Sequence, residues 1–401
     1  MTAVEQSLSH QVQGPTALEG PSHKIIPYPG SRRLLVFFSG TQKSNGRFDF
    51  WSSATAQTEN VLLINNGRNE WYQCGVPQFS ISIEDTAKKI HAWAKALNCN
   101  EILTFGVSMG GYAAILFGAA LNARVLALGF DSILRHPLSR SADRMPKDTP
   151  VNQRKLRPLV EKSRARITAL TGDMDFSDLI SLSRISDLPN VRSLTLRGVA
   201  HGVGRHINKY YGLADVIRDF VENDMLPVFK EAGKISFDKE LSKKIFQAHQ
   251  NYVTDNFEGS FAIAKEVLTV DPMSEPANFI AGMSLIGLKE HALAAEKLAI
   301  TLALVPHFTT AQFYLAKALR LSGRLEQAAQ HFTSYISARP DSVGARRNLA
   351  AIYKSLGNIN YSDYWAKQAD EAEQINKEAT EQKRLQKEAE KRTTLSTAKA
   401  K

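Results

Sequence analysis

The sequence has little cysteine and no long apolar run. Its 401 residues include two cysteines, Cys74 and Cys99, which excludes a disulfide scaffold and a zinc site built from cysteines alone. So small a number is typical of a reducing compartment. No stretch approaches the roughly 18 consecutive apolar residues of a membrane-spanning helix. Residues 1–23 contain no apolar run of signal-peptide length. We therefore expect a cytoplasmic protein without a membrane span.

Motifs for metals, nucleotides and nucleic acids are also missing. No group of His, Cys and Asp residues has the spacing of metal ligands, and neither G-x-x-x-x-G-K-[ST] nor G-x-G-x-x-G occurs. The basic end of the chain, from Lys391 to Lys401, is diluted by Glu and Thr. We expect no metal, no cofactor and no nucleic-acid partner, although a formal net charge of +10 permits an anionic one.

The chain has the composition of a large globular protein, and its character changes along its length. Hydrophobic residues make up 43% and charged residues 22%, which excludes disorder of the whole chain. The length allows two or three domains. We expect a flexible N-terminal arm over 1–30, an α/β domain over 31–229, helical repeats over 241–370, and a charged capping helix with a disordered tail over 371–401.

Six short apolar runs alternate with amphipathic stretches in the second of these regions. They lie at 34–38, 61–64, 101–105, 125–130, 167–170 and 191–196. Such runs are typical of strands in a sheet that is covered on both faces. Their alternation with helical stretches such as 83–97 and 111–121 predicts a mostly parallel α/β sheet with flanking helices. The sixth run is more polar, which predicts an edge strand.

A different pattern, with one constant period, runs through the third region. Pro272, Pro306 and Pro340 recur at a constant spacing of about 34 residues. Each is expected to end a helix, because proline lacks the N–H that would continue it. Small residues recur at the same spacing where two helices must approach closely; they are Ala248, Gly282, Ala316 and Ala350. A period of about 34 residues is that of tetratricopeptide repeats (TPRs), so the region resembles an all-α TPR solenoid. The resemblance implies a protein partner in its groove, and an unrelated helical bundle is the alternative.

The most informative segment is Gly106-Val107-Ser108-Met109-Gly110, a G-x-S-x-G motif directly after an apolar run and before an Ala-rich helical stretch. In this context the serine lies on a tight strand-to-helix turn, with glycines where a Cβ would collide with backbone. The turn exposes the Ser108 hydroxyl and directs the Met109 backbone N–H toward a reacting carbonyl oxygen. The motif predicts a nucleophile with one donor of an oxyanion hole. A tight-turn serine on an inactive scaffold is the alternative.

A serine nucleophile needs a base, and candidates follow in the chain order Ser, acid, His. The fifth apolar run ends in Gly172-Asp173-Met174-Asp175, and the sixth is followed by His201 in a loop of small residues. Both positions follow predicted strands, where the partners of a catalytic serine belong. The G-x-x-D spacing favours Asp175 as the acid, with Asp173 as the alternative.

With these residues, region 31–229 resembles the α/β-hydrolase fold of the serine esterase, thioesterase and acyltransferase superfamily. The resemblance implies attack by Ser108, proton transfer to His201, and an acyl-enzyme that is released to water or to an acceptor. It also implies that the loop after the first apolar run supplies the second oxyanion donor, at Gly40 or Thr41, with Ser39 beside the substrate.

Residues 131–166 occupy the place of a lid in such enzymes. They contain ten Lys and Arg residues against four Asp and Glu residues. This excess favours an anionic substrate, such as an acidic glycan, a phosphorylated carrier or an acyl-CoA. The alternative is a solvated basic helix. Arg68, which follows another apolar run, is a candidate contact for a carboxylate.

The sequence therefore predicts a serine hydrolase that cleaves an ester or a thioester, with repeats that dock a protein partner. An acyltransferase, or an acetyl esterase that acts on an anionic glycan, differs only in its substrate and acceptor. A non-catalytic scaffold, in which the repeats act and the hydrolase-like domain only binds a ligand, is the alternative from a different class.

Overall fold

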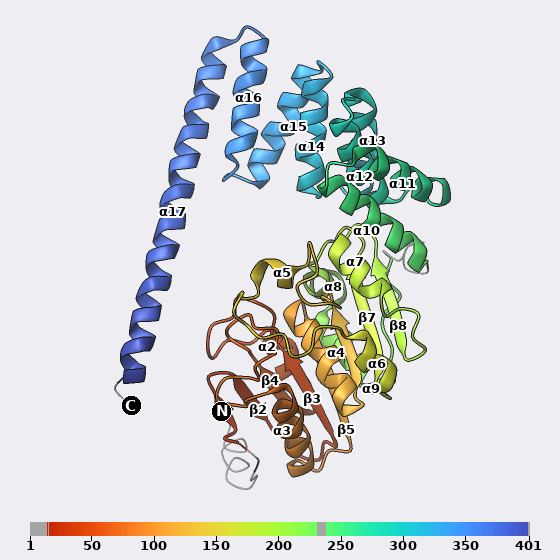
Figure 1. The fold of residues 1–401 in the computed structure, drawn as a ribbon, viewed down its shortest axis with the longest axis vertical. Helices are drawn as coiled ribbons and strands as arrows, with labels where there is room; N and C mark the ends of the chain where they lie inside the picture. Colours follow the sequence, from red (N-terminus) through yellow and green to blue (C-terminus); the bar gives the residue numbers. More distant parts are fainter. Residues whose placement is uncertain (1–13, 15, 231–237, 400–401) are drawn as a thin grey trace. The chain divides into compact units, whose positions relative to one another are not determined.

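The chain divides into two compact units, one up to Gln247 and one from Ala248. The computed structural model describes residue 14, residues 16–230 and residues 238–399 (Figure 1). The first unit is built on a β-sheet with helices on its faces, and the second is an array of helices. The boundary falls inside helix α10 (Lys239–Val253), a few residues after the predicted start of the repeats at residue 241.

The first unit contains an eight-stranded sheet with the strand order β1-β2-β4-β3-β5-β6-β7-β8. The strands are β1 (Glu19–Gly20), β2 (His23–Ile26), β3 (Arg33–Phe38), β4 (Asn60–Ile64), β5 (Glu101–Val107), β6 (Arg124–Leu128), β7 (Arg166–Gly172) and β8 (Val191–Leu196). Strand β2 is antiparallel to both of its neighbours, and the pairs from β4 to β8 are all parallel. The mostly parallel sheet is confirmed, and the six predicted strands correspond to β3 through β8.

Helices cover both faces of this sheet, as the apolar strands require. They are α2 (Trp51–Thr55), α3 (Ile83–Ala96), α4 (Met109–Leu121), α5 (Arg140–Arg144), α6 (Arg157–Lys162), α7 (Phe176–Ser183), α8 (Val203–Tyr211) and α9 (Leu213–Asn223). Alternate residues of each strand point to opposite faces. Leu34, Val36 and Phe38 of β3 pack in the cluster that contains α3, α4 and α6, whereas Leu35 and Phe37 pack in the cluster with α2, α8 and α9.

The flexible arm predicted over residues 1–30 is wrong for residues 19–26. Strand β2 pairs with β4 in the register His23↔Ile64, and the side chain of Ile25 is buried. The His23 Nε2 atom lies 2.8 Å from the carbonyl oxygen of Ala17, which anchors the preceding turn. A four-residue strand next to the edge of a sheet is too short to stand out in a hydrophobicity pattern. Residues 1–13 lie outside the described residues.

The second unit consists of helix pairs at a constant interval. After α10 come α11 (Phe257–Val270), α12 (Glu275–Gly287), α13 (His291–Leu304), α14 (Thr309–Leu321), α15 (Leu325–Ala338), α16 (Val343–Ser355) and α17 (Ile359–Lys399). The first residues of α12, α14 and α16 are equally spaced along the chain, and so are those of α11, α13, α15 and α17. Both series advance by the same step as the prolines at 272, 306 and 340. The predicted helical array with this period is therefore confirmed.

The small residues of the repeat lie where neighbouring helices touch, as predicted. A Cβ placed on Gly282 of α12 would lie 2.5 Å from the Cγ atom of Leu298 on α13. Ala248 and Ala316 are fully buried, and the carbonyl of Ala248 accepts a hydrogen bond from the hydroxyl of Ser260 on α11 at 2.8 Å. Close approach of the two helices of a pair thus explains the residue size at these positions.

Substitution of Gly282 by Ala is expected to destabilise the array by about 1–3 kcal/mol, because the added methyl group must displace Leu298. Gly344→Ala in α16 is the matched control. A Cβ at Gly344 meets nothing within 4 Å, so this substitution is expected to stabilise its helix by up to about 1 kcal/mol. Thermal unfolding of the full chain, followed by circular dichroism, compares the two variants. Shifts of the same sign would contradict the packing described here.

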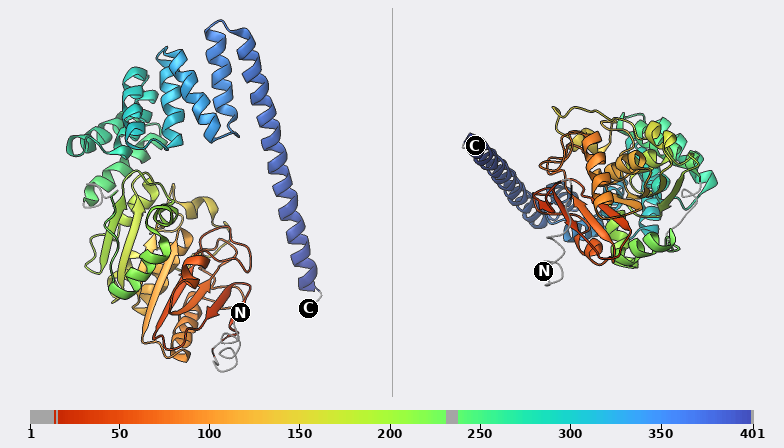
Figure 2. Two further views of the ribbon diagram at one scale, coloured as in Figure 1. Left: turned by 180° about the vertical axis from the view of Figure 1, so that it is seen from behind. Right: turned by 90° about the horizontal axis from the view of Figure 1, so that it is seen from below.

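Helix α17 departs from the repeat. It has 41 residues and extends to Lys399. The charged helix predicted after residue 371 is therefore present, whereas the disordered tail predicted to follow it within residues 371–401 is wrong as far as Lys399. Its first half packs on α16, where the side-chain amide of Asn376 donates to the carbonyl of Asp341 at 2.9 Å. Its second half continues well past the end of α16 (Figure 2). The spacing from Pro306 to Pro340, repeated once more along the chain, reaches Gln374, which lies inside this helix. A glutamine therefore stands where the repeat would place its next proline.

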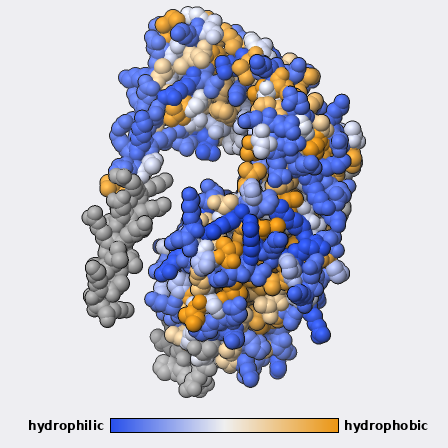
Figure 3. Space-filling model, in the orientation of Figure 1, coloured by the Kyte–Doolittle hydropathy of each residue, from blue (hydrophilic) through white to orange (hydrophobic). Residues whose placement is uncertain are grey.

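No described helix is both long and apolar enough to cross a membrane. The longest described helix, α17, is rich in Glu, Lys and Gln. Hydrophilic residues cover most of the face shown in Figure 3, with apolar residues scattered among them.

Candidate active site

Ser108 lies on the turn between β5 and α4. Its backbone has φ 60° and ψ −121°, a combination that is costly for a residue with a Cβ. The N–H of Ser108 donates to the carbonyl of Gly129 at 2.7 Å, which anchors the turn to the end of β6. The strained strand-to-helix turn expected from the G-x-S-x-G motif is therefore present.

The flanking glycines explain why the motif has this composition. A Cβ placed on Gly106 would lie 1.9 Å from the carbonyl oxygen of Gly110. A Cβ on Gly110 would lie 2.0 Å from the carbonyl oxygen of Phe38 at the end of β3. No side chain fits at either position, because backbone on both sides of the turn occupies the space.

His201 lies in the loop between β8 and α8, next to the serine turn. Its Nδ1 atom lies 2.7 Å from the Oδ2 atom of Asp178. A Cβ placed on Gly129, whose carbonyl accepts the Ser108 N–H, would lie 3.1 Å from that same Nδ1 atom. Ser108 and His201 therefore both lie beside Gly129, at the carboxyl end of β6. The Nε2 atom of His201 is buried and has no hydrogen-bond partner among the described residues. The bond that a general base accepts from a serine hydroxyl is therefore not formed between Ser108 and His201 in this structure.

The carboxylate that faces His201 belongs to Asp178, and the expectation that Asp175 or Asp173 would do so is wrong. Asp175 is the N-cap of α7 and accepts the N–H of Asp178 at 2.9 Å. Asp173 is buried and accepts the N–H of Gly198 at 2.8 Å. The acids nearest the strand end thus bind backbone N–H groups, whereas Asp178 projects from the first turn of α7.

A signal for this arrangement exists in the sequence. Asp175-x-x-Asp178 has the spacing of a helix N-cap and the third helical residue, which points to a helix start at residue 176. Once Asp175 is assigned as the cap, the next acid along the chain is the one that remains for the histidine.

The acid site is a cluster of four charged or titratable groups. Asp178 is 0% exposed, and Arg140 of α5 donates from Nη1 to its Oδ1 atom at 3.0 Å. The other terminal nitrogen of Arg140 pairs with Asp175. Burial, and then the charge of Asp175, raise the pKa of Asp178 to about 6. Burial opposes ionisation of Asp175 as well, but the Arg140 guanidinium holds the pKa of that carboxyl below its usual value.

Among the described residues, one group of His and acidic side chains lies close enough together to hold a metal ion. It consists of Asp175, Asp178 and His201, whose ligand atoms lie within 4.8 Å of one another. Arg140 bonds to both carboxylates, and His201 turns its Nδ1 atom to Asp178. These donor atoms are thus paired with one another and with a guanidinium, which favours a proton-transfer site over a metal site.

The loop after β3 lies beside the serine, as expected. A Cβ on Gly40 would be 3.7 Å from the Cβ of Ser108. However, the N–H of Gly40 donates to the Asp49 carboxylate at 2.8 Å, so in this structure it is not available as an oxyanion donor. The buried hydroxyl of Ser39 accepts the N–H of Asp49 at 3.0 Å and is not a substrate contact. Thr41 in this loop and Met109, the first residue of α4, are the remaining predicted donors.

Arg68 lies near this loop but is turned toward solvent. The side chain of its neighbour Asn69 accepts the N–H of Gln42 at 2.8 Å, which places the segment beside the loop. The Arg68 side chain itself is 69% exposed, and its ion pair is with Glu70 at 4.0 Å. The structure does not bring it against Ser108.

Residues 131–165 form α5, α6 and their connecting loops, and several arginines of the predicted lid are bonded to backbone carbonyls or to acids. Arg135 donates to the carbonyls of Pro146, Lys147 and Thr149. Arg154 donates to the carbonyl of Leu134, and Arg157 pairs with Asp187 outside the segment. The predicted basic lid is therefore partly bonded to its own backbone and partly paired with acids.

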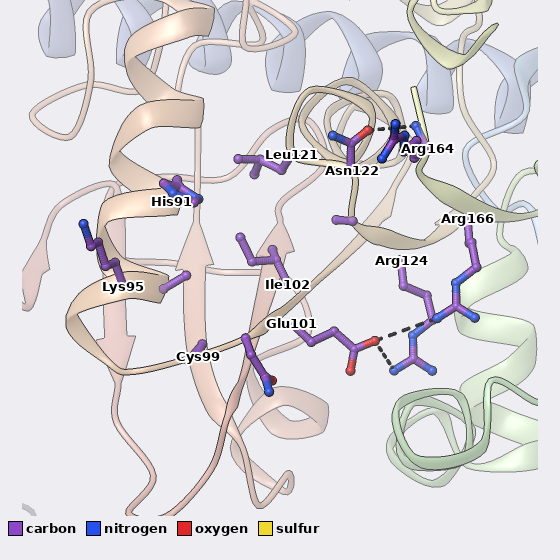
Figure 4. A pocket seen from close by; sticks show the side chains of 13 residues that line it. His91, Lys95, Cys99, Glu101, Ile102, Leu121, Asn122, Arg124, Arg164 and Arg166 are labelled. Carbon is purple, nitrogen blue, oxygen red and sulfur yellow. Dashed lines mark hydrogen bonds and ion pairs between the residues drawn. The ribbon is translucent and has the colours of Figure 1, made fainter. Parts of the chain in front are cut away.

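The pocket shown in Figure 4 lies at the amino ends of the parallel strands, opposite their carboxyl ends, where Ser108 lies. Its volume is about 450 Å³, and it is lined by the first residues of β5, β6 and β7, which are Glu101, Arg124 and Arg166. Glu101 pairs with Arg124 at 2.9 Å and with Arg166 at 3.9 Å. Because Ser108 follows the last residue of β5, this pocket is separate from the candidate active site.

The chain matches no protein-family model and no curated protein. Solved structures that match it include several of MamA. One, described as a crystal structure of MamA, has 18% identity, covers 34% of this chain and 81% of its own, and gives a TM-score of 0.33. A second, MamA 41-end from Desulfovibrio magneticus RS-1, has 13% identity, covers 43% of this chain and 93% of its own, and gives the same TM-score. Likenesses at this level assign neither a fold nor a function to this chain.

Proposed function

We propose that the first unit is a serine hydrolase of the α/β-hydrolase fold that acts on a carboxylic ester or thioester. The observation that carries the proposal is the strained turn of Ser108 beside a histidine whose Nδ1 atom faces a buried carboxylate. A serine on a strand-to-helix turn of a parallel sheet, with a histidine and an acid later in the chain, is the arrangement of that superfamily.

The site's geometry suggests the following sequence of steps. The Asp178 carboxylate keeps the proton of His201 on Nδ1, which leaves Nε2 to accept the proton of the Ser108 hydroxyl during attack. The backbone N–H of Met109, at the N-terminus of α4, and that of Thr41 stabilise the oxyanion. The imidazolium then protonates the leaving group, and water repeats the sequence on the acyl-enzyme. An acyltransferase would use the same residues and replace water with another acceptor.

We also propose that the helix pairs of the second unit are TPRs that bind a protein. Support comes from the constant interval between helix starts and from the buried small residues at the helix contacts. Such arrays present an extended groove to a partner.

Fluorophosphonate labelling tests the hydrolase proposal without knowledge of the substrate. The wild-type protein is expected to be labelled, Ser108→Ala to be unlabelled, and His201→Ala to be labelled at least about a thousandfold more slowly. His206→Ala is the matched control, because His206 lies on α8, where its ring packs 4.7 Å from that of Tyr210. Labelling of that variant is expected to remain at the wild-type rate.

Two results would contradict the proposal. Absence of labelling in wild-type protein that is folded by circular dichroism would favour the non-catalytic scaffold, in which the repeats act alone. Equal loss of labelling in His201→Ala and His206→Ala would show that any disturbance of this region, rather than the loss of a base, inactivates the serine.

A further inference from the structure

Helix α5 connects the two sides of the candidate active site. Arg140, at its first residue, reaches Asp178 and thereby the His201 side. Arg144, one turn later, donates from Nη1 to the hydroxyl of Thr41 in the loop after β3 at 3.3 Å. Residues four apart lie on the same face of a helix, so both arginines point toward the site from one short helix.

The position of α5 is fixed by buried contacts. The hydroxyl of Ser139 caps the helix by accepting the N–H of Ala142 at 3.2 Å. The N–H of Ser141 donates to the buried carboxylate of Asp131 at 2.7 Å. Together with the Arg140 ion pairs, these bonds leave Arg144 on a rigid support, as a binding residue requires.

The guanidinium of Arg144 is less engaged than those of four other arginines in residues 131–166, which are Arg135, Arg140, Arg154 and Arg157. Its side chain is 42% exposed, and its ion pair with the solvent-exposed Asp143 is long, at 3.9 Å. Apart from the bond to Thr41, no other hydrogen bond of its guanidinium to the described residues is present. A guanidinium with unused donors beside an oxyanion loop matches the planar geometry of a carboxylate.

The direction of the reaction assigns the part of the substrate that meets this guanidinium. The leaving group must approach His201 Nε2 to be protonated, so it lies on the histidine side. Arg144 lies on the Thr41 side, where the acyl part remains after the leaving group departs. We propose that Arg144 binds a carboxylate on the acyl part of the substrate, so that the enzyme hydrolyses esters or thioesters of dicarboxylic acids. This inference rests on the proposed serine hydrolase function.

A pair of aryl esters tests the proposal on the full-length protein. The esters are 4-nitrophenyl hemisuccinate, which carries the carboxylate, and 4-nitrophenyl butyrate, which lacks it. Wild-type protein is expected to prefer the hemisuccinate in kcat/KM. Arg144→Gln is expected to lower kcat/KM for the hemisuccinate about 10–100-fold, the effect of losing a charged hydrogen bond. The value for the butyrate is expected to fall by a smaller factor, because only the bond from Arg144 to Thr41 is lost with that ester.

Two further variants separate binding from general charge effects. Arg144→Lys is expected to retain part of the preference, since an ammonium keeps the charge but not the two parallel donors. Lys147→Gln removes the same charge from an exposed position of the same segment and is expected to leave both esters unaffected.

Each contrary outcome has a distinct meaning. Equal losses on both esters in Arg144→Gln would overturn the proposal and show that Arg144 only holds the Thr41 loop. A wild-type protein that labels with fluorophosphonate but shows no preference for the hemisuccinate would overturn it while leaving the hydrolase function intact. A wild-type protein that does not label would overturn both.

Discussion

Asp178→Asn is expected to slow fluorophosphonate labelling of Ser108 by about 10⁴-fold, whereas Asp175→Asn is expected to slow it by less than about tenfold. The reason is the 2.7 Å contact between Asp178 and His201. An amide at this position no longer fixes the proton on Nδ1 and no longer stabilises the imidazolium. The second-order rate of labelling measures both variants without a known substrate.

The Asp175→Asn variant is a close control because asparagine caps a helix as well as aspartate does. The Asp178 N–H therefore keeps its acceptor, and α7 keeps its start. Equal losses in the two variants, with both proteins folded, would overturn the assignment of Asp178 as the acid. A greater loss in Asp175→Asn would restore the residue that the sequence favours.

Arg140→Gln is expected to move the acidic limb of the pH–rate profile to higher pH. The pKa of Asp178 is already raised to about 6 by burial and by Asp175, and the guanidinium opposes both effects. Its removal raises the pKa of Asp178 further, so the carboxylate that His201 needs is lost at a higher pH. Asp175→Asn removes one cause of the elevation and is expected to move the limb to lower pH. Rates of fluorophosphonate labelling across the pH range give the acidic limb of each of the two variants.

The stability of Arg140→Gln supplies a second readout. Removal of one partner from a buried ion pair typically costs about 3–5 kcal/mol. The pKa of Asp178 in the folded protein is raised to about 6, above its usual value. The protonated carboxyl therefore favours folding most below a pH of about 4, and this contribution to stability is lost as the pH rises through about 6. The Arg140→Gln variant is therefore expected to have its lowest free energy of unfolding at neutral pH. If the acidic limbs of the pH–rate profiles shifted in the same direction in Arg140→Gln and Asp175→Asn, the opposite effects of Arg140 and Asp175 on the pKa of Asp178 would be contradicted.

The turn of Ser108 and the repeats were accessible from the sequence because local constraints determine them. Gly106 and Gly110 are required by backbone atoms within a few residues of Ser108 or at the end of a neighbouring strand. The small residues of the array likewise report a helix contact that recurs once in every repeat. Where the spacing of residue types follows from a short-range steric requirement, a pattern is sufficient.

The acid and the oxyanion loop depend instead on which backbone groups each side chain meets. Three aspartates stand close together in the chain after β7, and a helix start decides which of them turns toward His201. Gly40 has the right position but not the right partner, because Asp49, further along the chain, takes its N–H. The N-cap spacing of Asp175 and Asp178 carries the first of these arrangements, but no spacing rule links Gly40 to Asp49.

Charge composition was the least informative signal. The excess of basic residues in 131–166 indicated an anionic partner, but Arg135 and Arg154 donate to backbone carbonyls of the same segment. What a charge does depends on whether it is paired, and pairing is a property of the folded chain.

The prolines of the array mark junctions at which the chain can change length during evolution. A pair of helices duplicated between Pro272 and Pro340 adds one whole period and leaves every helix contact in phase. Gln374 offers no such junction, since α17 runs through it without a break. Recombination can therefore lengthen or shorten the array from within, one helix pair at a time, and leave the terminal helix α17 unchanged.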